Sequence, residues 1–379
     1  MSRKVRWRPV LIAGLVIALS IWAFVFKASR RMPDLEVYWT AGGRAAAAEP
    51  LYRVEDMHFQ FKYFPAFAVL AIPLGALPLI VAKGLWFFTS VAVLVVLLAL
   101  TPKLLVERRK STSLLIIITI VALGKFYVHE LMLGQVNLLF AMVVTCALLA
   151  MKTNREALAG LLVALAIVIK PYAVILVPWI IARRNRSAVL AVMGGMAIAI
   201  VLPAVMYGLG QTVALHHDWW RTVTDTTAPN LMTADNVSLS SVYARWLGHG
   251  SLATSMALFT AGALLGAAAL VFFRRRGIVF PEGLEGGLLL TLMPLLSPQG
   301  WDYVLLLSTP AVVYLANYED RLPGLLRAIT IVAVAAIGLT VFDLVGRTAY
   351  QTFMRFSGIT LCFLVVITAL CALRREGIA

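Results

Sequence analysis

Acidic residues are scarce in this chain, and so is charge of either sign. Of 379 residues only 18 are Asp or Glu, and charged residues make up 13% of the total. A typical soluble domain carries a charged share of about 25%. The three cysteines, Cys146, Cys362 and Cys371, have no CxxC spacing. The sequence therefore predicts neither a disulfide framework nor a zinc site.

Motifs for soluble nucleotide chemistry are also missing. The chain contains no Walker motif, no dinucleotide fingerprint and no HExxH sequence. Its 33 Lys and Arg residues would suggest a nucleic-acid partner in a soluble protein, but here the cations gather in short loops between apolar runs. We therefore expect no nucleic acid, no cofactor and no metal ion.

Apolar residues dominate instead. They make up 61% of the chain, and the mean hydropathy is +0.90. Apolar runs recur along the whole sequence without the period-2 alternation of a membrane barrel, so they predict transmembrane helices. The first run, 9–27, lacks a cleavage site and is expected to remain as a span. The predicted fold class is an all-α polytopic membrane protein.

Basic clusters predict how the chain threads the membrane. Seven clusters hold 20 of the 33 Lys and Arg residues, and the positive-inside rule places these clusters in the cytoplasm together with both termini. They lie at 2–8, 102–110, 152–156, 183–186, 274–276, 319–327 and 374–376. The sequence then predicts about twelve spans, near 9–27, 83–101, 113–128, 137–151, 157–170, 171–182, 188–207, 252–273, 286–296, 302–317, 328–345 and 352–373.

One apolar segment is excluded from the spans. Residues 63–80 are short and contain three prolines, and a crossing there would invert every later basic loop. We expect this segment to lie at the outer interface or to re-enter the membrane. Two exoplasmic loops, 28–82 and 208–250, then face the outside of the cell membrane together with several short polar turns.

The rare acids of the first outer loop are the first candidates for chemistry. Asp34 and Glu36 follow the first span directly. They are either solvated loop acids or groups that act on a substrate hydroxyl, as a general base does. Four further residues are predicted at the same boundary, either as snorkelling side chains or as a substrate site: Lys62, Tyr63, Lys170 and Arg347. Lys170 interrupts an apolar run, which favours a function, and a lysine there suits a phosphate.

Two polar turns complete the candidate set. The turn between spans near 128–137 carries His129, Gln135 and Asn137, and the turn 296–303 carries Ser297, Trp301 and Asp302. These side chains either pair the backbone of their turns or line a polar pocket. The tryptophans are either sugar platforms or an interfacial belt.

Five motifs in order resemble a known family. The segments PDLEVYW, FKYFPAFAVLAIPLGALP, GQVNLLF, AGLLVALAIVIKPYAVILVPW and LSPQGWDY resemble glycosyltransferase family 87, whose members have the GT-C fold. The resemblance implies one GT-C-type membrane domain over 1–379 with exoplasmic juxtamembrane helices. It also implies a polyprenyl-phosphate sugar donor, no nucleotide or metal, an exoplasmic site and Asp34 as the catalytic base.

The resemblance departs from the family pattern at one residue. Relatives often carry histidine after the Trp-Asp pair of the last motif, where it contacts the donor phosphate, whereas this chain has Tyr303. Tyrosine donates a hydrogen bond but adds no charge. The donor phosphate then has several candidate partners: Lys62, Lys170, Arg347, His129 and Tyr303.

Three functions stay open on the sequence alone. The first is an inverting transfer of mannose from polyprenyl phosphate to a hydroxyl of an envelope glycolipid or glycan, with Asp34 as base. The second is the same fold with an arabinose or hexosamine donor. The third is a transporter or flippase for a lipid-linked sugar, although no internal repeat is visible.

Overall fold

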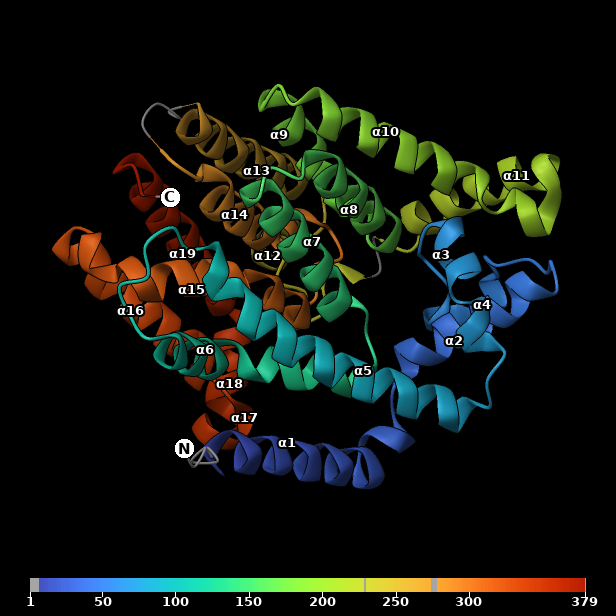
Figure 1. Ribbon diagram of the computed structural model, residues 1–379, viewed down its shortest axis with the longest axis horizontal. Helices are drawn as coiled ribbons and strands as arrows, with labels where there is room; N and C mark the ends of the chain where they lie inside the picture. Colours follow the sequence, from blue (N-terminus) through green and yellow to red (C-terminus); the bar gives the residue numbers. More distant parts are fainter. Residues whose placement is uncertain (1–6, 228–229, 274–277, 379) are drawn as a thin grey trace, which may run out of the picture.

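The computed structural model of this chain describes residues 7–227, 230–273 and 278–378. Every named element in these ranges is a helix, and the helices are joined by short connections (Figure 1). The all-helical prediction is therefore confirmed for the described part of the chain.

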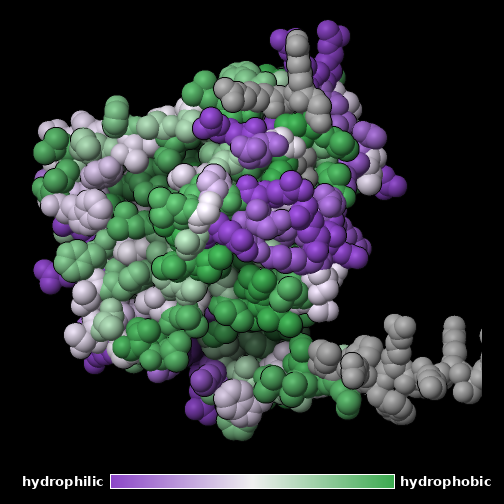
Figure 2. Space-filling view, turned by 90° about the vertical axis from the view of Figure 1, so that its left-hand side faces the viewer, coloured by the Kyte–Doolittle hydropathy of each residue, from purple (hydrophilic) through white to green (hydrophobic). Residues whose placement is uncertain are grey.

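Long apolar helices form the outer parts of the bundle. Their outward side chains are largely exposed, among them Leu258 at 69% and Phe259 at 74%. Figure 2 shows broad hydrophobic areas on one face of the molecule, interrupted by a hydrophilic area. Exposure of this kind fits a lipid environment. Among the described residues, five such helices are long and apolar enough to cross a membrane: α1 (Trp7–Phe26), α5 (Leu79–Leu100), α6 (Thr112–Leu133), α13 (Ser251–Phe272) and α19 (Gly358–Arg375).

The expected number of about twelve spans is not confirmed. A sixth span is obtained if α10 (Arg186–Val201) and α11 (Ala204–Asp225), which meet at an angle of 91°, are counted as one broken crossing. Other predicted spans form shorter helices, and a helix of 16 residues covers only about 24 Å of a roughly 30 Å hydrocarbon layer. These are α7 (Asn137–Lys152), α8 (Glu156–Ile169), η4 with α9 (Pro171–Ile175, Leu176–Ala182), α14 (Pro281–Leu296), η6 with α15 (Asp302–Ser308, Thr309–Tyr318) and α16 (Gly324–Leu339).

The two segments predicted as exoplasmic loops, 28–82 and 208–250, are more helical than the sequence suggests. The first contains α2 (Pro33–Ala46), followed by η2 (Val54–Phe59), α3 (Pro65–Leu70) and α4 (Ile72–Gly75). The helices at 65–75 are too short to cross a bilayer. The second loop is occupied by the end of α11 and by α12 (Leu239–Leu247). The last predicted span begins later than expected, because a separate short helix, α18 (Arg347–Arg355), precedes α19.

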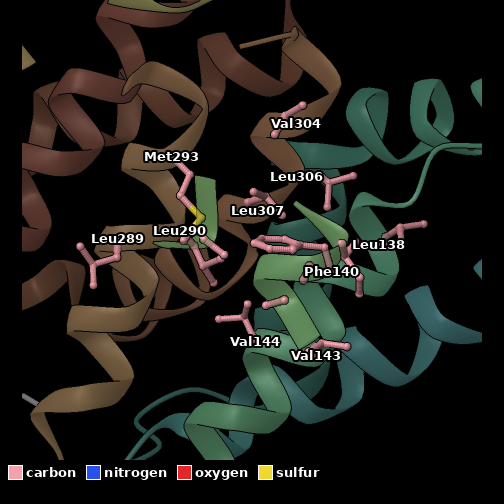
Figure 3. Packing of buried hydrophobic residues seen from close by; sticks show 14 of the residues in the cluster. Leu138, Phe140, Val143, Val144, Leu289, Leu290, Met293, Val304, Leu306 and Leu307 are labelled. Atoms are coloured by element: carbon pink, nitrogen blue, oxygen red, sulfur yellow. The ribbon is translucent and has the colours of Figure 1, made fainter. Parts of the chain in front are cut away.

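The core of the bundle surrounds α14. Every residue from Pro281 to Leu295 is buried, so this helix contacts protein on all sides. Figure 3 shows Leu290 and Met293 of α14 near Phe140 of α7, with Leu307 of η6 beside them. This packing holds α14 and η6, the segments on either side of the turn 296–303, and so fixes the position of the turn.

Polar contacts divide the bundle into two ends. At one end, basic clusters contact each other through Arg109 and Asp320 (2.6 Å), Lys152 and the Leu105 carbonyl (2.8 Å), and Arg183 and Glu156 (3.2 Å). Helix α8 starts at Glu156 and runs about 21 Å to Lys170 at the opposite end. The grouping of the basic clusters fits the predicted threading, in which they share one side of the membrane.

Candidate active site

A cavity of about 490 Å³ lies at the end of the bundle opposite the basic clusters. Six parts of the chain line it, from α2 at the start to η6 near residue 303. Eight of the residues that the sequence singled out lie on its walls: Asp34, Lys62, Tyr63, Gln135, Lys170, Ser297, Trp301 and Tyr303.

Asp34 reaches this cavity from the first turn of α2. Pro33 occupies the first helical position, where its missing N–H has no cost, and an acid in the first turn is favoured by the helix dipole. The turn is fixed from behind, because the Met32 amide donates to the Met132 carbonyl of α6 at 3.1 Å. Asp34 therefore sits on an anchored helix terminus and not on a free loop.

Lys170 reaches the cavity because α8 ends there. The residue has extended backbone angles (φ −141°, ψ 106°), as expected before a proline, and η4 begins at Pro171. Its ammonium group lies 3.1 Å from the Tyr63 hydroxyl and 4.6 Å from the centre of the Tyr63 ring. The interruption that the sequence shows is thus a helix break that turns a lysine toward the cavity.

A buried hydrogen-bond network connects Lys170 to α2. The Tyr38 hydroxyl lies 2.6 Å from the Tyr63 hydroxyl and donates to the Gln135 side-chain oxygen at 2.8 Å. The same oxygen accepts from the Val136 amide at 3.2 Å, and the Gln135 amide nitrogen donates to the Tyr303 hydroxyl at 3.4 Å. Four chain segments are thereby held in one arrangement around Asp34.

Burial and neighbouring charges in the cavity shift the pKa of Asp34 in opposite directions. Burial raises the pKa of the Asp34 carboxyl above its ordinary value, and the charge of Lys170 opposes this shift. Smaller opposing effects on this pKa come from Gln135, His129 and Lys62. Burial also lowers the pKa of Lys62, which the Asp34 carboxylate partly restores. The cavity thus combines a desolvated carboxylate, which can accept a proton, with two lysines, which can bind an anionic ligand.

A comparison with known protein families identifies the family of this chain. A model for glycosyltransferase family 87 matches residues 61–298, which is well over half of the chain. The chain belongs to glycosyltransferase family 87. No curated protein and no solved structure matches it. The resemblance seen in the motifs is confirmed, and the chain is a membrane glycosyltransferase of this family.

The part that matches family 87 holds only one portion of the cavity. It includes Tyr63, Gln135, Lys170 and Ser297, whereas α2 with Asp34 and the residues after 298 lie outside it. The turn after 298 is held by the second outer loop, where Asn236 donates to the Pro298 carbonyl at 2.8 Å. The Val237 amide donates to the Gly300 carbonyl at 2.7 Å. These contacts position Trp301 at the cavity wall.

Five predicted site residues of this family 87 protein lie outside the cavity. Asn137 is buried and bonds the Glu130 carboxylate (2.8 Å) and the Tyr172 hydroxyl (3.2 Å), so it fixes the α6–α7 turn. Arg347 is exposed at the start of α18 and lines no wall of the cavity. The remaining three are Glu36, His129 and Asp302.

Two of these three residues form a pair next to Tyr303. Nδ1 of His129 lies 3.1 Å from the Asp302 carboxylate, and the His129 ring meets the Tyr303 ring edge to face at 5.2 Å. A histidine from α6 therefore packs against Tyr303, the position at which the motif resemblance predicts a histidine. Glu36 forms an ion pair with the buried Lys83 at 2.7 Å.

Several cavity residues were missed by the sequence reasoning. Tyr38 lies four residues after Asp34, so helical spacing places both on one face of α2 and could have revealed it. Tyr172 carries no comparable signal, because it reaches the cavity only through the packing of distant segments. Among the described residues, no group of three His, Cys, Asp or Glu side chains is arranged to hold a metal ion.

Proposed function

We propose that this protein transfers mannose from a polyprenyl-phosphate donor to a hydroxyl of an envelope glycolipid or glycan. The reaction takes place on the exoplasmic face of the cell membrane, and Asp34 is the general base. The whole chain forms one GT-C-type domain with both termini in the cytoplasm. The observation that carries the proposal is the cavity that Asp34 shares with Lys62 and Lys170.

The donor phosphate suits the two lysines. A sugar phosphate that leaves an anomeric carbon gains negative charge in the transition state, and fixed cations stabilise that charge. Lys170 is held in place by Tyr63, and Lys62 lies near enough to Asp34 for the two to shift each other's pKa. The Tyr303 hydroxyl adds a hydrogen-bond donor at the same cavity. His129 and Arg347 lie off this wall, so we give the donor phosphate to the two lysines.

The transfer is a single displacement. The acceptor oxygen attacks the anomeric carbon and passes its proton to the Asp34 carboxylate. The bond from that carbon to the phosphate oxygen breaks, and the phosphate leaves with the electron pair. One displacement inverts the anomeric centre, through a transition state with oxocarbenium character. A β-linked donor then gives an α-linked product.

Aromatic side chains provide platforms for the sugars. Trp219 and Trp301 line the cavity on opposite outer segments, and the Trp219 indole donates to the Lys62 carbonyl at 3.2 Å. Flat rings of this kind stack against sugar faces, while Ser297 and Gln135 supply polar groups at the same walls. The lipid chain of the donor would follow the short helices α3 and α4 beside Lys62.

A transfer assay with defined donors tests this function. Purified protein in liposomes is mixed with radiolabelled polyprenyl-phosphate mannose, arabinose or hexosamine and with membrane glycolipids as acceptors. We expect label from the mannose donor in an α-linked product and loss of transfer in Asp34→Asn. Transfer of a different sugar would replace the donor assignment. Full activity in Asp34→Asn would overturn the role of the carboxylate.

A further inference from the structure

A second cavity lies on the other side of the first turn of α2. It has a volume of about 390 Å³ and shares only Pro33 and Leu133 with the cavity of Asp34. Its remaining walls are formed by Arg30, Arg31, Glu36, His129 and Met132. The two cavities are therefore separated by the turn that carries the proposed base, and the second one has its own set of charged groups.

The charge of the second cavity is positive. Arg30 and Arg31 are both exposed, and neither guanidinium has a carboxylate within ion-pair distance among the residues that the structure describes. Glu36, the one acid on the wall, is already paired with Lys83 at 2.7 Å. Two guanidinium groups on one cavity wall suit the oxygens of a phosphate, which the planar N–H fork of arginine binds bidentately.

His129 extends this basic set. Its Nδ1 faces the Asp302 carboxylate at 3.1 Å, so Nε2 is the ring nitrogen that can contact a ligand. A ring that donates from both nitrogens carries a positive charge. Asp302 is nearly buried, and it fixes the orientation of the ring from behind. The cavity thus has a supported donor in addition to two flexible ones.

Apolar surface borders the basic groups. Helix α1 runs along the edge of the bundle, and Phe24 near its end packs on Phe87 and Phe88 of α5 (Figure 1). Phe26, four residues before Arg30 at the end of α1, and Val128, which precedes His129 on α6, are 62% and 59% exposed. A ligand that fits here has an anionic head and a hydrocarbon tail. A free sugar lacks both, and free phosphate lacks the hydrocarbon tail.

We infer that this second cavity binds the phosphate headgroup of an anionic membrane lipid, held by Arg30, Arg31 and His129. The site is separate from the donor phosphate site and does not depend on the proposed reaction. It places a bound lipid phosphate on one side of the first turn of α2 and the transfer cavity on the other. Glu36 and its partner Lys83 then lie at the boundary of the lipid site.

Lipid binding to purified protein tests this inference. Protein in a neutral detergent is titrated with dioctanoyl phosphatidylglycerol, and bound lipid is counted by native mass spectrometry. We expect saturable binding that weakens by about tenfold or more, or about 1.4 kcal/mol, in Arg30→Gln/Arg31→Gln. Arg221→Gln, which removes an exposed arginine elsewhere on the outer segments, is the matched control and should bind as the parent does.

Three further arms decide the chemistry. Dioctanoyl phosphatidylcholine should bind much more weakly, and inorganic phosphate at millimolar concentration should not compete. His129→Gln should weaken binding to a smaller degree. Arg30→Lys/Arg31→Lys keeps the charge without the fork, so it should fold and bind with intermediate affinity. Equal binding of both lipids, competition by inorganic phosphate, or unchanged binding in the arginine variants would each overturn the inference.

Discussion

The ammonium group of Lys170 lies 3.1 Å from the hydroxyl of Tyr63, although 107 residues separate the two along the chain. The same group stands 4.6 Å from the centre of the tyrosine ring. A hydrogen bond and a cation–π contact together restrict a long side chain that would otherwise move freely. Tyr63 is in turn bonded to Tyr38 on the helix that carries Asp34, so the cation and the carboxylate share one support.

Removing the charge of Lys170 should lower kcat/KM more than removing the hydrogen bond between Lys170 and Tyr63. We expect Lys170→Met to reduce kcat/KM by about 10²–10³, as the loss of a fixed electrostatic group does. Tyr63→Phe keeps the ring and loses one hydrogen bond, so a decrease of about tenfold is expected. Lys103→Met, an exposed lysine at the opposite end, is the control. Transfer kinetics with the labelled donor measure all three, and equal effects at positions 103 and 170 would contradict the assignment.

Asp34→Asn should lower the activity of the protein without lowering its stability. Loss of a general base lowers the rate by about 10²–10⁴. Burial raises the pKa of this carboxyl, so its ionised form destabilises the folded state at neutral pH. The Tm of Asp34→Asn at pH 7 should therefore equal or exceed that of the parent, and the difference should shrink at acidic pH.

Asp225→Asn, which changes an exposed acid on α11, should alter neither quantity. Thermal unfolding followed with a thiol-reactive dye and transfer kinetics give both values. A lower Tm in Asp34→Asn would show that the carboxylate has a structural role instead.

The pH dependence of transfer should follow the pKa of Asp34. A base acts when ionised, so kcat/KM should rise with pH through a pKa above that of an ordinary aspartate, because burial raises it. Lys170 opposes this rise more than Lys62 does. Lys170→Met should therefore move the acidic limb to higher pH by more than Lys62→Met. A shift to lower pH in either variant, measured at constant ionic strength, would contradict this electrostatic description.

Arg374 should be essential for stability, in contrast to its neighbour. Its side chain and that of Glu285 are both fully buried, and they form an ion pair at 2.9 Å. Removal of one member of a buried pair costs about 3–5 kcal/mol. Arg374→Met should lower the Tm strongly, whereas Arg375→Met, an exposed residue in the same turn, should have little effect. Similar Tm values for the two variants would argue against the pair as a structural requirement.

Labelling of introduced cysteines tests the proposed sides of the membrane. Arg221 lies on α11, whose Trp219 lines the transfer cavity, and Arg108 lies in a basic cluster at the opposite end. In a background that lacks the three native cysteines, Arg221→Cys should react with a membrane-impermeant maleimide in intact cells. Arg108→Cys should react only after the membrane is permeabilised. The reverse pattern would invert the topology.

The sequence was informative where a residue type was out of place. Asp34 stood out among few acids, and Lys170 stood out within an apolar run, and both line the cavity. Arg347 was assigned to the same side of the membrane, but a shared side says nothing about lateral position, and the structure has it exposed on α18. His129 was grouped with the donor site, whereas packing of α6 turns it toward the second cavity.

The predicted number of spans is not confirmed, for a related physical reason. Apolar runs such as 137–151 and 157–170 are spaced like crossings, but their helices end after 14 to 16 residues. An apolar composition shows that a segment is kept from water, but it does not distinguish burial in lipid from burial in protein. Much of α7 and all but the last residue of α14 are buried by protein. The neighbours of Tyr172 are set by tertiary contacts, so the sequence does not predict it as a cavity residue, whereas the helical spacing from Asp34 could have revealed Tyr38.

The order in which the chain is made has a consequence for the transfer cavity. Its walls begin at Pro33 and are completed only by Trp301, Tyr303 and Val304, so the last contribution comes 271 positions after the first. While the chain is being synthesised and inserted, Asp34 is already outside the first span, but Trp301 and Tyr303 have not yet arrived. A protein interrupted before residue 301 would carry the acid and both lysines without an enclosed site. Transferase activity should therefore appear late in biogenesis and report on complete membrane insertion.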